Sequence, residues 1–134
     1  TADATHLTDA IPQADAVLLD APCSASGILG RHPEARWRKL PEDADRLAEL
    51  QGRLLDEAAT RVRPGGRLVY SVCSIEPCEN EEAIGRFLSR YPSFTRAALP
   101  ERYRGLTRDG DVLIAPGADR RDGFYIASLR NGAT

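Results

Sequence analysis

Two kinds of hydrophobic pattern alternate along the first two thirds of the chain. A short apolar run bounded by acids at 15–20 is typical of a strand that is buried on both faces of a parallel sheet. Between 41 and 62, apolar residues recur every three or four positions, which predicts an amphipathic helix of about five turns. The Pro-Gly-Gly at 64–66 should end this helix, and 67–73 then predicts a second strand. Because a helix connects them, the two strands should be parallel, with their carboxyl ends at the same edge of the sheet.

The rest of the chain contains one more helical pattern and then several short strand patterns. Residues 79–91 carry apolar side chains on one face and glutamates in the first turns, as expected of a helix. Short strand candidates follow at 94–99, 112–115 and 124–129, separated by Gly, Pro and Asp. Since no helical pattern separates these candidates, they should pair antiparallel at one edge of the sheet. The predicted fold class is therefore α/β with a mixed sheet: two crossover units and an antiparallel edge, which is half of a doubly wound fold.

Length, composition and charge narrow the class of protein. With 134 residues, of which 42% are hydrophobic and 28% charged, the chain is expected to form one soluble domain. The longest apolar run, 16–19, is far shorter than the roughly 20 residues that cross a bilayer, so we expect no membrane span and a cytoplasmic location. The three cysteines are an odd number at uneven spacing, which favours reduced thiols over disulfides. The net charge of -2 gives no overall attraction to a polyanion, although 31–39 forms a short basic segment around Trp37.

Chemically active side chains concentrate where the two predicted parallel strands end. Asp20 closes the first strand, Cys23 lies just beyond it, and Cys73 lies at the end of the second strand. In α/β folds the carboxyl ends of parallel strands form the binding crevice, so the two thiols should converge there. Packing is the alternative role for both thiols, because free cysteine is often a small core residue. Cys78 and the two histidines of the chain show no zinc-binding spacing, so we expect no metal site.

The sequence around these residues resembles a known enzyme family. Four segments, in the same order, are similar to the signature segments of the RNA 5-methylcytosine methyltransferases, specifically the bacterial ribosomal RNA enzymes of the Fmu or Sun type. The segments are Leu18-Leu19-Asp20-Ala21-Pro22-Cys23-Ser24-Ala25-Ser26-Gly27, Arg31-His32-Pro33 with Trp37, Val69-Tyr70-Ser71-Val72-Cys73-Ser74-Ile75 with Glu79-Asn80-Glu81, and Asp122-Gly123-Phe124-Tyr125-Ile126-Ala127. Together they extend over most of the chain, which makes the match far more specific than a lone Pro-Cys pair.

The resemblance implies a Rossmann-like methyltransferase sheet and S-adenosylmethionine as the methyl donor. Family members hold this cofactor with a glycine-rich loop after the first strand and an acidic residue at the second strand, and neither pattern is found in this sequence. The segment 2–4 resembles the end of the family's third strand. We therefore expect residues 1–134 to be the C-terminal half of the catalytic domain, a partial domain that lacks the cofactor loop and the N-terminal RNA-binding domain. As an isolated chain it is expected to be inactive.

The resemblance also implies a role for each candidate residue. Cytosine C5 is a poor nucleophile, and addition of a thiolate at C6 turns the ring into an enamine that can take a methyl group from a sulfonium. By resemblance, Cys73 is the attacking nucleophile and Cys23 assists release of the product. Asp20 would hold the N3/N4 edge of the cytosine or the methionine end of the cofactor, and Asp3 would hold the adenine. Ribosomal RNA is the implied partner.

Two other functions fit the same residues. In the DNA 5-methylcytosine enzymes the thiol of the Pro-Cys pair is the nucleophile, so a DNA cytosine methyltransferase would use Cys23. A non-catalytic RNA-binding fragment would keep the crevice without ever having had the cofactor loop. If the sheet lacks its neighbouring strands, an exposed apolar edge would favour self-association of the chain.

Overall fold

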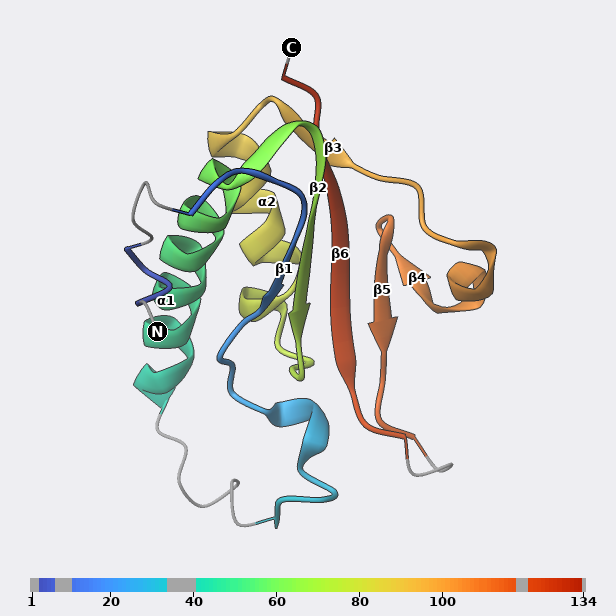
Figure 1. The fold of residues 1–134 in the computed structure, drawn as a ribbon. Helices are drawn as coiled ribbons and strands as arrows, with labels where there is room; N and C mark the ends of the chain where they lie inside the picture. Colours follow the sequence, from blue (N-terminus) through green and yellow to red (C-terminus); the bar gives the residue numbers. More distant parts are fainter. Residues whose placement is uncertain (1–2, 7–10, 34–40, 118–120, 134) are drawn as a thin grey trace.

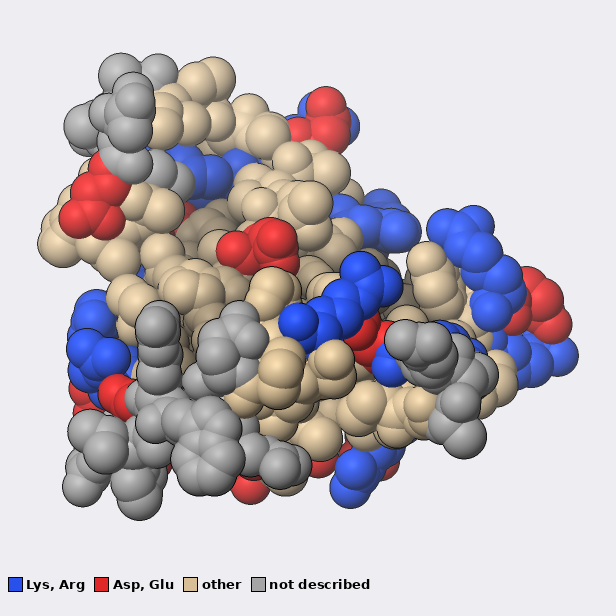
Figure 2. All heavy atoms as spheres, turned by 90° about the horizontal axis from the view of Figure 1, so that it is seen from below, with Lys and Arg blue, Asp and Glu red and all other residues tan. Residues whose placement is uncertain are grey.

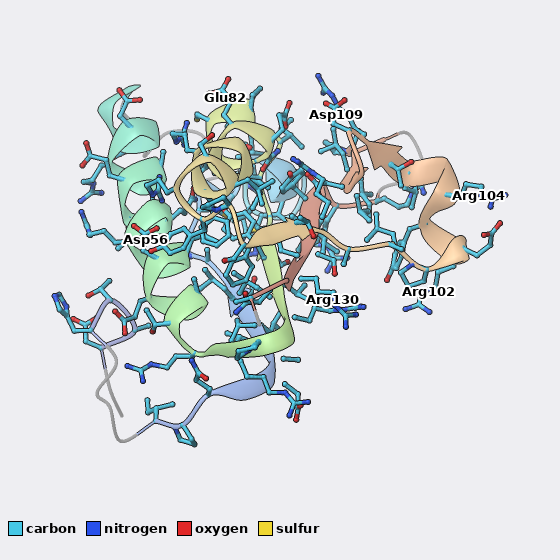
Figure 3. The ribbon with its side chains drawn as sticks, turned by 90° about the horizontal axis from the view of Figure 1, so that it is seen from above. Asp56, Glu82, Arg102, Arg104, Asp109 and Arg130 are labelled. Carbon is cyan, nitrogen blue, oxygen red and sulfur yellow. The ribbon has the colours of Figure 1, made fainter. Side chains whose placement is uncertain are left out.

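The computed structural model describes residues 3–6, 11–33, 41–117 and 121–133. In this part of the chain, one six-stranded sheet carries its α-helices on the same side (Figure 1). The helices are α1 (Pro41–Thr60) and α2 (Glu81–Arg90). They also contact each other: Arg90 of α2 pairs with Asp56 of α1 at 2.7 Å, and Asp56 is labelled on α1 in Figure 3. The fold is thus a two-layer α/β arrangement, and the predicted fold class is confirmed.

The sheet combines one parallel pair with an antiparallel remainder. Its strands are β1 (Ala14–Asp20), β2 (Val62–Val72), β3 (Phe94–Arg96), β4 (Thr107–Arg108), β5 (Asp111–Ile114) and β6 (Phe124–Asn131). The order across the sheet is β1-β2-β6-β5-β4, and β3 also pairs with β6. β1 and β2 are parallel and joined through α1, whereas the described pairs that involve β3, β4, β5 or β6 are antiparallel. This arrangement confirms the predicted mixed sheet and places the last strand directly beside β2. Of the two predicted crossover units, the described strands form one, β1-α1-β2, because the strands after α2 pair antiparallel.

Strand β2 begins earlier than the sequence pattern predicts. Helix α1 ends before the Pro-Gly-Gly, and β2 already includes it. Residues 64–66 therefore form an irregularity within the strand: Ala14 pairs with Val62, and two residues later Ala16 pairs with Arg67. One of the two glycines has a φ of 73°, which an ordinary side chain would disfavour. The prediction that these residues end the helix was wrong, because Pro and Gly mark a bulge in a strand as readily as the end of a helix.

Helix α2 begins later than predicted. The 3₁₀ turn η3 (Pro77–Glu79) precedes it, and the helix itself begins at Glu81. Glu79 is therefore not a solvated acid in the first helical turn, but a fully buried one in η3. The pattern was misleading because an acid at this point of a sequence also suits the positive end of the helix dipole. A buried carboxylate needs hydrogen bonds or an opposite charge, and these come from other segments of the chain.

Strand β1 is not buried on both faces, contrary to the prediction. It is an edge strand of the described sheet, with β2 as its neighbour. Leu18 in β1 is 70% exposed, whereas Leu68, Tyr70 and Val72 in the central strand β2 are fully buried. The apolar run predicted the strand correctly. Its degree of burial depends on neighbouring strands and helices, which no local pattern specifies.

The hydrophobic core lies between the sheet and the two helices. Leu55 of α1 and both Ile84 and Phe87 of α2 are fully buried there against side chains of β2 and β6. In the last strand, Tyr125 faces the core and is also fully buried. Among the described residues, no helix combines the length and apolar character needed to cross a bilayer. Trp37 and most of the basic segment around it lie outside the described residues.

Candidate active site

Two cysteine thiols meet at the carboxyl ends of the parallel strands. β1 ends at Asp20 and β2 ends at Val72, and Asp20 is in register with Ser71. Cys23 follows β1 after two loop residues, and Cys73 directly follows β2. Their Sγ atoms are 3.2 Å apart, a hydrogen-bonding distance for two thiols, and both cysteines are free and partly buried. The topology thus brings together the two thiols that the sequence predicts to converge.

Close backbone contacts fix the loops that carry the thiols. The Gly27 amide donates to the Cys73 carbonyl (3.1 Å), and the Gly123 amide donates to the Gly27 carbonyl (2.7 Å). A side chain at Gly27 would place its Cβ 2.2 Å from the Gly123 carbonyl oxygen, and one at Gly123 would meet the Gly27 Cα at 2.9 Å. Only glycine fits at either position. The loop after β1, the end of β2 and the start of β6 are therefore held against one another.

A buried carboxylate joins the residues that follow the two cysteines. Glu79 Oε1 accepts hydrogen bonds from the Ser24 amide (2.8 Å) and from Gln51 Nε2 (3.1 Å). Glu79 Oε2 accepts hydrogen bonds from the hydroxyls of Ser24 (2.5 Å) and Ser74. These four donors are neutral, so hydrogen bonds rather than an opposite charge compensate the burial. Each of the two serines comes directly after one of the cysteines, so a single carboxylate holds both thiol-bearing segments.

Glu79 is a site residue to which the sequence analysis assigns no role, although it lies in one of the four segments that resemble the enzyme family. The available signal is the repeated Cys-Ser pair at 23–24 and 73–74, because two serines buried beside two converging thiols need hydrogen-bond acceptors. Other side chains support the same segment. The Tyr70 hydroxyl donates to the Glu79 carbonyl at 2.8 Å, and Gln51 Nε2 also donates to the Pro22 carbonyl at 3.0 Å.

Burial keeps the Cys23 thiol protonated. Loss of solvation is the main cause that raises the pKa of Cys23 to about 12. The hydrogen bond to Cys73 acts in the same direction, as do the charges of Cys73 and Glu79, and a hydrogen bond from the Ala25 backbone partly offsets them. Burial first, and then the Glu79 charge, also raise the pKa of the Tyr70 hydroxyl. At neutral pH, Cys23 therefore keeps its proton and can donate it toward Cys73 Sγ.

The two aspartates predicted to bind substrate or cofactor lie in different settings. Asp20 is exposed at the end of β1, next to the loop that carries Cys23. Asp3 begins a turn, in which the His6 amide donates to the Asp3 carbonyl at 3.0 Å, and Ala2 of the segment expected to end a strand lies outside the described residues. The amide and hydroxyl of Thr5 donate to Asp3 Oδ1 (2.9 and 2.7 Å), which lowers the pKa of Asp3. Both exposed carboxylates are acceptors that fit the amine, ribose or adenine donors of S-adenosylmethionine.

A cavity lies beside the thiol loops. It has a volume of 560 Å³ and its lining residues are Gly27, Gly30, Arg31, Pro116, Gly117, Arg121 and Asp122. Arg31 Nε pairs with Asp122 Oδ2 at 2.9 Å. Figure 2 shows the end of the molecule toward which β1 and β2 run, where acidic and basic side chains lie both in the middle and at the edges of a surface that is otherwise uncharged. Arginine side chains at a cavity of this kind suit the phosphates of a nucleic acid strand.

Comparison with known proteins identifies relatives over most of the chain. A family model described as "16S rRNA methyltransferase RsmB/F" matches residues 1–130. The "Probable ribosomal RNA small subunit methyltransferase B" of Bacillus subtilis is 42% identical over 123 residues, which are 88% of this chain and 28% of that protein. The "Ribosomal RNA small subunit methyltransferase B" of Cronobacter sakazakii is 44% identical over 117 residues, which are 87% of this chain and 26% of that protein. The chain thus spans about a quarter of the length of these curated relatives.

Solved structures share the fold. The crystal structure of NSun6 from Pyrococcus horikoshii with SFG matches with a TM-score of 0.83 at 29% identity, covering 99% of this chain and 34% of that one. A methyltransferase homolog protein from Pyrococcus horikoshii matches with a TM-score of 0.78 at 29% identity, covering 97% of this chain and 43% of that one. The mixed sheet of this chain therefore has the same fold as the matching part of these structures.

Proposed function

Because the chain belongs to the RsmB/F family of 16S rRNA methyltransferases, whose members depend on S-adenosylmethionine, we propose that the intact protein methylates C5 of a cytosine in ribosomal RNA through a covalent adduct with Cys73. The observation that carries this proposal is the 3.2 Å contact between the sulfur atoms of Cys23 and Cys73. Two thiols at this distance can act in turn on one pyrimidine ring. Residues 1–134 would supply the thiol-bearing half of the catalytic domain, and other segments would hold most of the cofactor.

Cys73 is the nucleophile in this proposal. As a thiolate, its sulfur adds to C6 of the cytosine, and the C5–C6 double bond opens to leave C5 nucleophilic. When bound, S-adenosylmethionine would supply the methyl group: its sulfur–methyl bond would break as the bond to C5 forms, and the sulfonium would leave as a neutral thioether. Since C5 then carries both the methyl group and its original hydrogen, a base must remove that proton. The electron pair left on C5 restores the double bond and expels Cys73 as a thiolate.

Cys23 is suited to be this base, because its protonation depends on the state of Cys73. In the free protein, the contact with Cys73 contributes to the raised pKa of Cys23. In the adduct the Cys73 sulfur is a neutral thioether that no longer repels a second thiolate, so the pKa of Cys23 falls although burial still raises it, and the thiol loses its proton to solvent more readily than in the free protein. The Cys23 thiolate then accepts the C5 proton and becomes a thiol again. Cys23 thus assists product release without competing as a nucleophile beforehand.

Asp20 is proposed to orient the cytosine. Its carboxylate is exposed at the end of β1, close in sequence to Cys23, and its oxygens can accept a hydrogen bond from the N4 amino group. It could equally hold the amino group at the methionine end of S-adenosylmethionine, which is also a donor. Asp3 would accept a hydrogen bond from the adenine. In the 560 Å³ cavity that Gly27 of the Cys23 loop lines, arginines would contact RNA phosphates on either side of the target base.

Cysteine variants of the intact protein test the assignment of roles. With RNA and S-adenosylmethionine, Cys73→Ala should abolish methylation, because no adduct can form. Cys23→Ala should still form the adduct and should remain trapped on the RNA, since the C5 proton is not removed. Denaturing gels detect the trapped complex. Adducts that accumulate on Cys73→Ala but not on Cys23→Ala would contradict the assignment.

A third thiol and a second nucleic acid provide the controls. Cys78→Ser changes a cysteine outside the 3.2 Å contact and should methylate RNA at the parent rate. DNA in place of RNA in the same assay distinguishes a DNA cytosine methyltransferase, which would form its adduct through Cys23. A non-catalytic RNA-binding protein would bind RNA but give no adduct in any variant.

A further inference from the structure

Glu79 is a fully buried acid to which the proposed reaction assigns no role. Its carboxylate accepts four hydrogen bonds from three parts of the chain: Ser24 after β1, Ser74 after β2, and Gln51 in α1. A carboxylate is costly to bury, and a hydrophobic side chain of the same size would often be neutral or more stable. Its presence beside two thiols therefore indicates a use for its oxygens at this place.

The serines that bind Glu79 connect it to the sulfur atoms. Ser24 and Ser74 are each one residue from a thiol, and their hydroxyl oxygens are 3.3 Å apart. Ser26 extends the same cluster, since its Oγ lies 3.2 Å from Ser74 Oγ and accepts a hydrogen bond from the Ile75 amide at 3.0 Å. The thiol contact and the serine cluster thus run in parallel between the same two loops. A change in the serine cluster would alter the separation of the two loops, and with it the separation of the sulfur atoms.

We propose that Glu79 is a positioning residue for the thiol chemistry: it fixes the distance between the Cys23 and Cys73 sulfur atoms by binding the serine that follows each of them. The importance of Glu79 for methyl transfer rests on the proposed function, but its effect on the distance between the two sulfur atoms does not. The charge of Glu79 has a second effect, because it is one of the causes that raise the pKa of Cys23 and so keep that thiol protonated.

The variant Glu79→Gln is a mild test of this role. A glutamine can place its oxygen against the Ser24 amide and Gln51, and its amino group against the two hydroxyls if these turn to accept. The protein should therefore fold, but the hydrogen bonds to the hydroxyls become neutral, longer and weaker. The two loops should then separate more easily than in the parent.

Thiol–disulfide exchange reports how readily the two sulfur atoms meet, and it needs no RNA. In equilibrium with oxidised glutathione, Cys23 and Cys73 form a sulfur–sulfur bond while one oxidised glutathione is reduced to two glutathione molecules. The equilibrium constant gives the effective concentration of one thiol at the other. We would measure it in the intact protein carrying Cys78→Ser, quantifying the 23–73 disulfide by peptide mass mapping. Glu79→Gln should lower this effective concentration by about tenfold.

A destabilised variant with intact loops separates positioning from general stability. Phe87→Leu truncates a fully buried ring of α2 and should lower the melting temperature at least as much as Glu79→Gln does. It should leave the effective concentration of the thiols within about twofold of the parent. The proposal is overturned if Glu79→Gln also stays within about twofold, or if Phe87→Leu lowers the value as much as Glu79→Gln.

Two further variants decide the matter if Glu79→Gln does not fold. Ser24→Ala and Ser74→Ala each remove one hydroxyl donor and should each lower the effective concentration by about threefold. The proposal is overturned if neither variant changes the effective concentration. Methyl transfer by the same proteins gives an independent result, in which Glu79→Gln lowers kcat and leaves KM for RNA unchanged. If the parent does not methylate RNA although Glu79→Gln lowers the thiol effective concentration, the proposed function fails and the positioning role stands.

Discussion

Glu79 beside the thiols and Asp111 in the outer strands are both fully buried acids, but they are compensated in opposite ways. Asp111 Oδ2 accepts a hydrogen bond from the Tyr125 hydroxyl (2.6 Å) and pairs with the Arg96 guanidinium (3.0 Å). Glu79 instead accepts hydrogen bonds from serine, glutamine and backbone donors, none of which carries a charge. One acid is therefore neutralised by a cation, and the other is solvated by dipoles.

This difference explains why an acid can stand next to reactive thiols. A cation in place of the serines would stabilise the thiolate form of Cys23 as well as the carboxylate. The neutral donors leave the negative charge of Glu79 uncancelled, and that charge contributes to the raised pKa of Cys23 and, after burial, of Cys78. Hydrogen bonds thus fix the position of the thiol loops while Cys23 stays protonated. In the outer strands no thiol has to stay protonated, so an ion pair can compensate the buried charge of Asp111.

The largest expected effect comes from crowding the thiol edge. Gly27→Ala would place a Cβ 2.2 Å from the Gly123 carbonyl oxygen, and the backbone on both sides would have to move. We expect a loss of at least about 3 kcal/mol in the free energy of unfolding, measured in urea. Gly85→Ala is the matched control: nothing lies within 4 Å of its Cβ on the exposed side of α2, so it should stabilise the protein by about 0.5 to 1 kcal/mol. If Gly27→Ala is as stable as the parent, the thiol edge is not the rigid region described here.

A smaller effect distinguishes the two buried acids by their response to salt. Glu79→Gln and Asp111→Asn should each cost about 2 kcal/mol at low ionic strength, because each removes charge-assisted hydrogen bonds. The Arg96 side chain is 32% exposed, so salt screens its pairing with Asp111, whereas the donors of Glu79 are neutral. Between low salt and about 1 M KCl, the cost of Asp111→Asn should fall by about 0.5 kcal/mol and that of Glu79→Gln should stay constant. Equal salt dependence in urea unfolding would remove the distinction between the two sites.

The smallest effect concerns the pH dependence of one thiol. Only the thiolate reacts with iodoacetamide, so the raised pKa of about 12 makes alkylation of Cys23 slow at pH 8. Cys73→Ala removes the hydrogen bond and the charge that contribute to the shift, but burial persists. The midpoint of the alkylation rate should therefore fall toward, but stay above, the ordinary value of 9.0. Peptide mass mapping follows Cys23 alone; a midpoint that is unchanged or higher would show that the two thiols do not interact.

Local sequence patterns predicted the elements that carry the site. The apolar run at 15–20, the periodic helix that follows and the apolar run at 67–73 predicted a parallel pair of strands, and the pair formed. Parallel pairing alone places their carboxyl ends at one edge, so the meeting of Cys23 and Cys73 could be predicted without a structure. The chemistry was predicted from the resemblance to a methyltransferase family, and the residue types fit it, since a thiolate can add to a pyrimidine ring. The roles assigned to Cys73, Cys23, Asp20 and Asp3 stay predictions.

Tertiary structure alone decided burial and long-range compensation. Leu18 reads as a core residue and is 70% exposed, because it lies in an edge strand. Glu79 reads as a surface acid and is fully buried, because serines and a glutamine from distant segments surround it. Secondary-structure propensity and hydrophobic periodicity depend on a few neighbouring residues, so they can be recognised in the sequence alone. Exposure and hydrogen-bond satisfaction depend on which distant segments meet, and only the folded chain brings those segments together.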